Sequence, residues 1–236
     1  MKHQAPQLAL ALPAPRTWGG RRAGAGRPPG PDPGLPHASR QPFRKLPAHV
    51  TLRVRADVPS LRTVAIVRAI ERTFAHGCVR PGFRLVHYSL QGNHAHLIVE
   101  ASDRHTLGRG MKAIGARLAR AVNRLARRPG PVLADRYHAR LLPTPKEVRN
   151  ALRHVLLNAR RHARAALGHA VRLDPASSAR WFDGWKRLAP APRDHPSGAP
   201  PPGRPPVARA RTWLVAVGWR RHGLLDPADV PGAAGQ

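Results

Sequence analysis

Acidic residues, cysteine and aromatic residues are all scarce in this chain, and it has no long apolar run. Its single cysteine, Cys78, excludes an internal disulfide bond and a cysteine-based zinc site, and it suits a reducing compartment. No stretch approaches the roughly 18 apolar residues that a membrane-spanning helix needs. The apolar segment 8–12 is soon interrupted by Pro13 and Pro15, which argues against a signal peptide. We therefore expect a cytoplasmic protein with no membrane partner.

The shortage of Asp and Glu leaves a large excess of positive charge. The 41 Lys and Arg residues face only 12 Asp and Glu residues, so the formal net charge is +29 and the sequence pI is about 12.0. A charge of this size favours polyanionic partners, with nucleic acid first and an anionic membrane a distant second. Phosphate binding follows from the charge itself.

Proline, glycine and arginine divide the chain into three parts. Residues 1–47 show no apolar periodicity and predict a disordered basic arm. Residues 48–188 carry the periodic apolar pattern of a folded domain, and residues 189–236 form a Pro-rich linker with a short C-terminal segment. In the arm, Arg27 is the arginine of a Gly-Arg-Pro core, preceded by Arg21 and Arg22, that is similar to AT-hook segments, which insert arginine into the minor groove of DNA.

The apolar periodicity of the middle part predicts the element order βαββαβα. Ser60 is the expected cap of the first helix, and Thr144 with Pro145 and Glu147 forms a capping box for the last. This order predicts an α+β ferredoxin-like sandwich, with an antiparallel-dominated sheet and helices on one face. The expected elements are strands at 50–54, 83–90, 94–100 and 132–142 and helices at 61–77, 107–127 and 145–164.

The third expected strand carries a His-x-His pair. Because side chains alternate along a strand, His94 and His96 share one face while Ala95 and Leu97 occupy the other. Two neutral imidazoles held side by side on a rigid strand are suitable ligands for a divalent metal. In so basic a protein, such a site indicates phosphodiester chemistry.

The segment 93–100 (NHAHLIVE), with His49-Val50-Thr51 before it and Leu156-Leu157-Asn158 after it, resembles the insertion-sequence and repeat-associated tyrosine transposases. This family belongs to the His-hydrophobic-His nuclease superfamily, and the resemblance covers residues 47–165. It implies metal-dependent cleavage of single-stranded or hairpin DNA and transposition, with Mg²⁺ or Mn²⁺ as the metal. The metal ligands that it implies here are His94, His96 and Asn158.

The family's catalytic tyrosine is missing. It would lie on the last helix one turn before Asn158, where this chain has His154. An imidazole there can act as a nucleophile with a labile adduct, as a general base or as a further metal ligand. Tyr88 is expected in the core, which leaves Tyr137 as the reserve nucleophile. The chain is accordingly either a single-strand DNA endonuclease with its tyrosine replaced or a DNA-binding module without nuclease activity.

The remaining expectations concern how DNA is held. The last expected helix has basic residues beside its polar face, which would flank a phosphate backbone. Whether two chains combine into a homodimer is left open. The arginines expected to contact DNA from this helix are Arg153, Arg160, Arg161 and Arg164.

Overall fold

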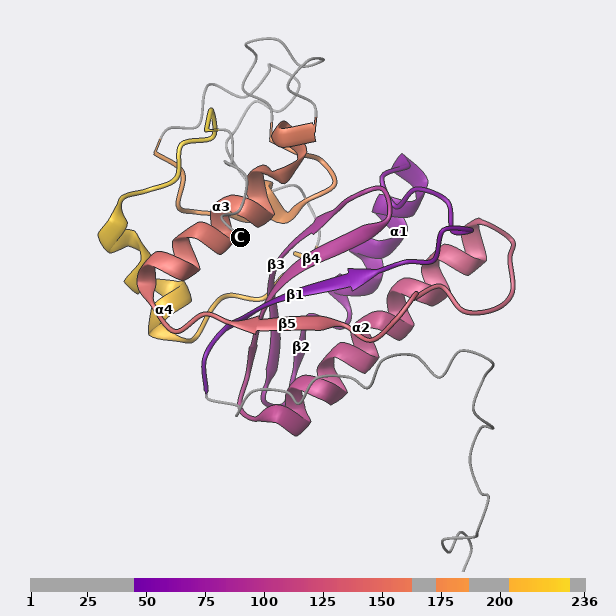
Figure 1. The fold of residues 1–236 in the computed structure, drawn as a ribbon, viewed down its shortest axis with the longest axis horizontal. Coiled ribbons are helices and arrows are strands. Elements are labelled where there is room, and N and C mark those ends of the chain that lie inside the picture. The colour runs from indigo at the N-terminus through magenta and orange to yellow at the C-terminus, as the bar shows by residue number, and fades with distance from the viewer. Residues whose placement is uncertain (1–44, 163–172, 187–203, 230–236) are drawn as a thin grey trace, which may run out of the picture. The chain divides into compact units, whose positions relative to one another are not determined.

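The computed structural model describes residues 45–162, 173–186 and 204–229 (Figure 1). Five strands form one antiparallel sheet in the order β2-β3-β4-β1-β5, so the predicted α+β class is confirmed. None of the described helices is long and apolar enough to cross a membrane. The elements are β1 Ala48–Arg53, α1 Val64–Ala75, β2 Val79–Arg80, β3 Phe83–Leu90, β4 His94–Ala101, α2 Arg104–Leu125, β5 His138–Leu141, α3 Pro145–His162, the 3-10 turn η1 Ser178–Trp181, α4 Trp213–Ala216 and the 3-10 turn η2 Gly218–His222.

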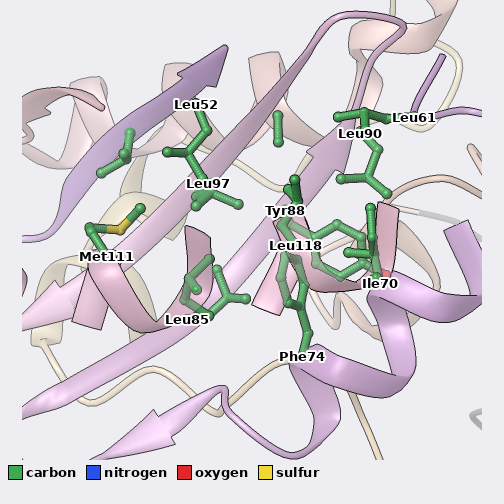
Figure 2. Packing of buried hydrophobic residues seen from close by; sticks show 14 of the residues in the cluster. Leu52, Leu61, Ile70, Phe74, Leu85, Tyr88, Leu90, Leu97, Met111 and Leu118 are labelled. Carbon is green, nitrogen blue, oxygen red and sulfur yellow. The ribbon is translucent and has the colours of Figure 1, made fainter. Parts of the chain in front are cut away.

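Helices α1 and α2 cover one face of the sheet and form the larger core with it (Figure 2). Leu97 of β4 and Leu118 of α2 are fully buried there, as is Phe74 of α1. Burying a side chain of this size contributes about 1.5–3 kcal/mol each. The α1–α2 side of the sheet is therefore the structural core of the domain.

Helix α3 lies on the opposite face, so the expectation of helices on one face is wrong in this detail (Figure 1). Val86 of β3 and Ile98 of β4 point away from the first core and pack with Leu152 and Leu156 of α3. Residues 95–100 of β4 are all buried, so both faces of this strand must be covered. This second layer places α3 directly over the histidine face of β4.

Local signals explain most element boundaries. The expected cap of the last helix is present, since Thr144 Oγ1 accepts from the Glu147 N–H at 3.2 Å and donates to the Glu147 carboxylate at 2.9 Å. The first helix begins at Val64, later than expected, because Thr63 is its N-cap. The last strand is much shorter than residues 132–142, and Leu133 makes only an isolated bridge to Val54.

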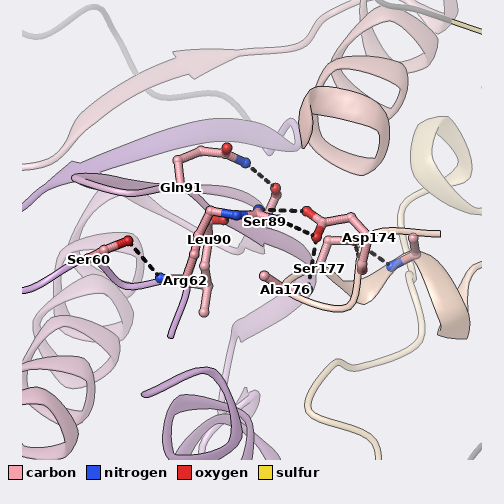
Figure 3. Close-up of polar contacts among 9 residues, drawn as sticks. Ser60, Arg62, Ser89, Leu90, Gln91, Asp174, Ala176 and Ser177 are labelled. Atoms are coloured by element: carbon pink, nitrogen blue, oxygen red, sulfur yellow. Dashed lines mark hydrogen bonds and ion pairs between the residues drawn. The ribbon is translucent and has the colours of Figure 1, made fainter. Parts of the chain in front are cut away.

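Segment 173–186 is fixed to the end of the sheet by polar contacts (Figure 3). The Arg62 guanidinium donates to both carboxylate oxygens of Asp174, at 2.8 and 3.0 Å, and to the Leu90 carbonyl at 2.9 Å. The Leu90 N–H donates to the Ala176 carbonyl at 2.8 Å. The C-terminal segment also docks, because Trp219 is fully buried against α3 in the second core.

Candidate metal centre

Strand register brings the polar residues of β1 next to the histidines of β4. Thr51 pairs with His96, and Arg53 pairs with His94. Because Val50 and Leu52 point into the larger core, their neighbours His49 and Thr51 point to the α3 face. The predicted strand geometry of His94 and His96 is thus present, and β1 adds a third histidine to the same face.

His96 lies at the centre of this group and has a partner on each ring nitrogen. Its Nε2 is 3.0 Å from His94 Nε2, while its Nδ1 is 3.2 Å from His49 Nε2 and 3.3 Å from Thr51 Oγ1. Its side chain is buried, at 8% exposure. His96 is therefore held in one orientation by both neighbouring strands.

His154 reaches the same point from α3. Its ring centroid is 4.6 Å from that of His96 and 5.5 Å from that of His49. One nitrogen each from His49, His96 and His154 lies within 4.8 Å of the others. Three imidazoles converging from two strands and a helix form a donor set that fits a divalent metal ion.

The surroundings keep the histidine donors in the form that binds metal. The pKa of His49 is lowered to about 4, chiefly by burial and then by the charges of His154, Arg140 and His138, so this ring is neutral at pH 7. The Asn93 side-chain carbonyl lies 2.8 Å from His94 Nδ1 and accepts its proton. That hydrogen bond leaves His94 Nε2 as the nitrogen with a lone pair.

The other predicted site residues lie in different surroundings. Asn158 is buried one turn beyond His154 on α3, and its role as a ligand stays a prediction. Tyr137 is partly buried and packs against the larger core, and its role as the reserve nucleophile stays a prediction. Tyr88 lies in that core as expected. Its hydroxyl donates to Glu71 at 2.8 Å, and burial raises its pKa.

Only some of the arginines predicted to contact DNA lie among the residues that the structure describes. Arg153 lies on α3, and its Nε is 3.4 Å from the Asp229 carboxylate. Arg160 and Arg161 lie in the last turn of α3, where the backbone alone is described. Arg164 and the arm residues Arg21, Arg22 and Arg27 fall outside the described residues.

Sequence reasoning gave no role to His49 or to the edge strand β5. His138 pairs with Thr51 and Arg140 pairs with His49, so both side chains extend the histidine face across β1. Apolar Val50 and Leu52 alternate with polar neighbours along β1, and this pattern placed His49 on the polar face of the strand. Its proximity to His96 depends on the pairing of β1 with β4, which local pattern does not specify.

Comparisons with known proteins give matches among solved structures alone. No family model and no curated protein matches the chain. The chain is similar to a REP-associated tyrosine transposase bound to a REP hairpin, at 14% identity and a TM-score of 0.43 over 54% of this chain and 74% of that one. It is also similar to a candidate transposase from Deinococcus radiodurans R1, at 16% identity and a TM-score of 0.36 over 45% of this chain and 85% of that one. The proposal below rests on the histidine geometry.

Proposed function

We propose that the chain is a transposase-like, metal-dependent DNA endonuclease that binds and cleaves single-stranded or hairpin DNA. The observation that carries this proposal is the convergence of His49, His96 and His154 in a protein with a net charge of +29. The histidines supply the donors for a divalent ion, and the excess of Lys and Arg supplies the attraction for a phosphate backbone. A divalent ion bound there would polarise a phosphodiester and neutralise charge developing on its oxygens.

The donor set also bears on which metal is held. The three ligand atoms that converge are all imidazole nitrogens. Mg²⁺ prefers oxygen ligands and binds imidazole poorly, whereas Zn²⁺, Ni²⁺ and Cu²⁺ bind it well. Of the two ions implied by the family resemblance, Mn²⁺ suits this site better than Mg²⁺. We therefore assign the site to an imidazole-binding divalent metal.

His154 takes part in the site as a metal ligand. Its ring is held against those of His49 and His96. An imidazole at this distance from two others shares an ion with them more readily than it attacks a phosphodiester, because coordination occupies the lone pair that attack would use. The position that carries the nucleophile in the resembling family thus extends the metal site here.

The replacement of the family's tyrosine by His154 favours a second candidate function, DNA binding without cleavage. Of the chain's two tyrosines, Tyr88 is buried in the larger core and Tyr137 is partly buried against it. In this reading the bound metal and the basic surface hold a DNA hairpin or single strand without breaking it.

One experiment on hairpin-flanked single-stranded DNA with Mn²⁺ distinguishes the two functions. The native protein is compared with His154→Tyr, which places a phenol at the position of the family's tyrosine. His154→Phe is the control, because its ring has the shape of the tyrosine ring but lacks the hydroxyl. Cleavage by the native protein supports the endonuclease. A denaturation-resistant adduct formed by His154→Tyr alone supports the binding protein with a competent site. No metal-dependent binding or cleavage by any of the three would overturn both readings.

A further inference from the structure

Trp213 exposes a large aromatic surface to solvent. About half of its side chain is accessible, at 49%, whereas Trp185 and Trp219 are buried and Trp181 is partly buried against the core. The Arg221 guanidinium lies over the Trp213 ring, 4.7 Å from its centroid. Tryptophan is enriched at interfaces because its ring offers a large apolar surface beside a polar N–H group.

The backbone that carries Trp213 is held firmly against the sheet. The buried Glu100 carboxylate, at the end of β4, accepts from the N–H groups of Arg211 and Thr212 at 2.8 Å each and from the Thr212 hydroxyl at 2.6 Å. Thr212 is the N-cap of α4, and Trp213 is the first residue of that helix. The exposed ring is therefore presented from a fixed position, which lowers the entropy lost when a partner stacks on it.

Exposed arginines precede Trp213 in the chain. Exposure alternates along residues 209–213, so Arg209 and Arg211 are exposed like Trp213. Arg221 forms no ion pair within the described part of the chain. Its neighbour Arg220, in contrast, is paired with Asp183 at 2.9 Å and lies over the buried Trp219. Arg209, Arg211, Trp213 and Arg221 together are called the Trp213 surface.

We propose that the Trp213 surface binds single-stranded DNA, with a base stacked on the ring face that the Arg221 guanidinium covers in the free protein and the adjoining phosphates held by Arg221 and the neighbouring arginines. Flat aromatic rings set in positive charge are how proteins bind single strands without sequence preference. A duplex hides its base faces, and an acidic protein partner would not need the ring. The inference goes beyond the histidine cluster and shares with the proposed function only its partner, DNA.

The position of Glu100 places this surface along the same strand face as the metal centre. His96 and Glu100 are four residues apart on β4 and point to the same side of the sheet. Four residues of strand span about 13 Å. Glu100, the anchor of this surface, therefore lies about 13 Å along β4 from His96 of the metal centre.

The test is the fluorescence anisotropy of a labelled oligothymidylate mixed with the full-length protein, in EDTA so that metal does not contribute. Trp213→Ala should raise Kd about 5- to 140-fold, the range for loss of one stacked base. Because stacking is not ionic, that factor should persist as salt is raised. Arg221→Gln should lower the salt slope by about 0.7, the value for one phosphate contact on a single strand.

Matched variants separate this surface from the general attraction of a basic chain. Arg220→Gln removes the same charge one residue away, at an arginine already paired with Asp183, and should leave Kd within about twofold. Trp213→Phe should retain most of the affinity, because a phenyl ring still stacks. Trp213→Ala should bind duplex DNA as the native protein does.

The inference is wrong if Trp213→Ala binds the oligothymidylate as tightly as the native protein, or if it loses affinity for duplex and single strand equally. Metal titration of Trp213→Ala is the second readout. Unchanged metal affinity combined with weakened DNA binding assigns the loss to the Trp213 surface, whatever the fate of the histidine site. Failure of the histidine variants to change metal binding would overturn the proposed function and leave this surface standing.

Discussion

The imidazole rings of His96 and His154 lie 4.6 Å apart between centroids, at an interplanar angle of 75°. One belongs to the central strand β4 and the other to α3, the helix that covers this face of the sheet. Their approach depends on the packing of Ile98 against α3, which seats the helix over the strand. A site assembled this way has two ligand-bearing elements fixed by the hydrophobic core, which limits the reorganisation needed on metal binding.

The first prediction distinguishes two sets of ligands around His96. His49→Ala should weaken metal binding at least about tenfold, since even loss of a group supporting a ligand commonly costs this much. His138→Ala, on the neighbouring edge strand, should have a much smaller effect. Isothermal titration calorimetry measures both. A loss confined to His94→Ala and Asn158→Ala would favour the ligand set implied by the sequence and contradict the role of His49.

The second prediction concerns the orientation of His96. Thr51 Oγ1 lies 3.3 Å from His96 Nδ1, so Thr51 is a positioning residue for this ring. Thr51→Val keeps the shape of the side chain and removes the hydroxyl, and it should lower metal affinity about 10- to 100-fold. Thr51→Ser should restore most of the affinity. Equal affinities for the Val and Ser variants would show that the hydroxyl has no part in the site.

The third prediction is a pH dependence of stability that arises at His87, away from the metal centre. Burial lowers the pKa of His87 from 6.5 to about 4, with Asp183 opposing the shift. Between these values the unfolded chain binds the proton and the folded protein does not, so folding is weakened by acid. The free energy of unfolding should fall as pH drops from 6.5 to about 4, by as much as about 3 kcal/mol from this group.

The measurement is urea unfolding at several pH values, compared with His87→Asn, whose amide can still reach Ser178. The variant is expected to lose this part of the pH dependence even if its stability is lower throughout. If the native protein and His87→Asn show the same slope over this range, His87 is not the group responsible.

The fourth prediction concerns the anchor of the C-terminal segment. Glu100→Ala leaves the N–H groups of Arg211 and Thr212 without their acceptor and should lower the free energy of unfolding by about 3 kcal/mol. Limited proteolysis should then cut near Thr212 first. Glu147→Ala is the control, because it removes a partly exposed carboxylate at a helix start and should cost about 1 kcal/mol. Similar losses in the two variants would contradict the anchoring role of Glu100.

Local sequence pattern predicted the parts of the site that lie within one element. The alternation along β4 placed His94 and His96 on one face, and the helical spacing placed His154 and Asn158 on one side of α3. The approach of His49 to His96 requires the β1–β4 pairing, and that pairing joins residues far apart in the sequence. The covering of both sheet faces was missed because Ile98 shares its face of β4 with His96 and Glu100, and such a half-polar face does not by itself show that a helix covers it.

Metal binding by the native protein and by His96→Ala and His154→Ala tests the central claim most directly. Calorimetric titration with Zn²⁺ and Mn²⁺, with the exposed His105→Ala as control, gives stoichiometry and affinity for each. The histidine cluster predicts one tightly bound ion per native chain, at least about tenfold weaker binding in both cluster variants and native affinity in His105→Ala. Native affinity in His96→Ala and His154→Ala would contradict the metal centre.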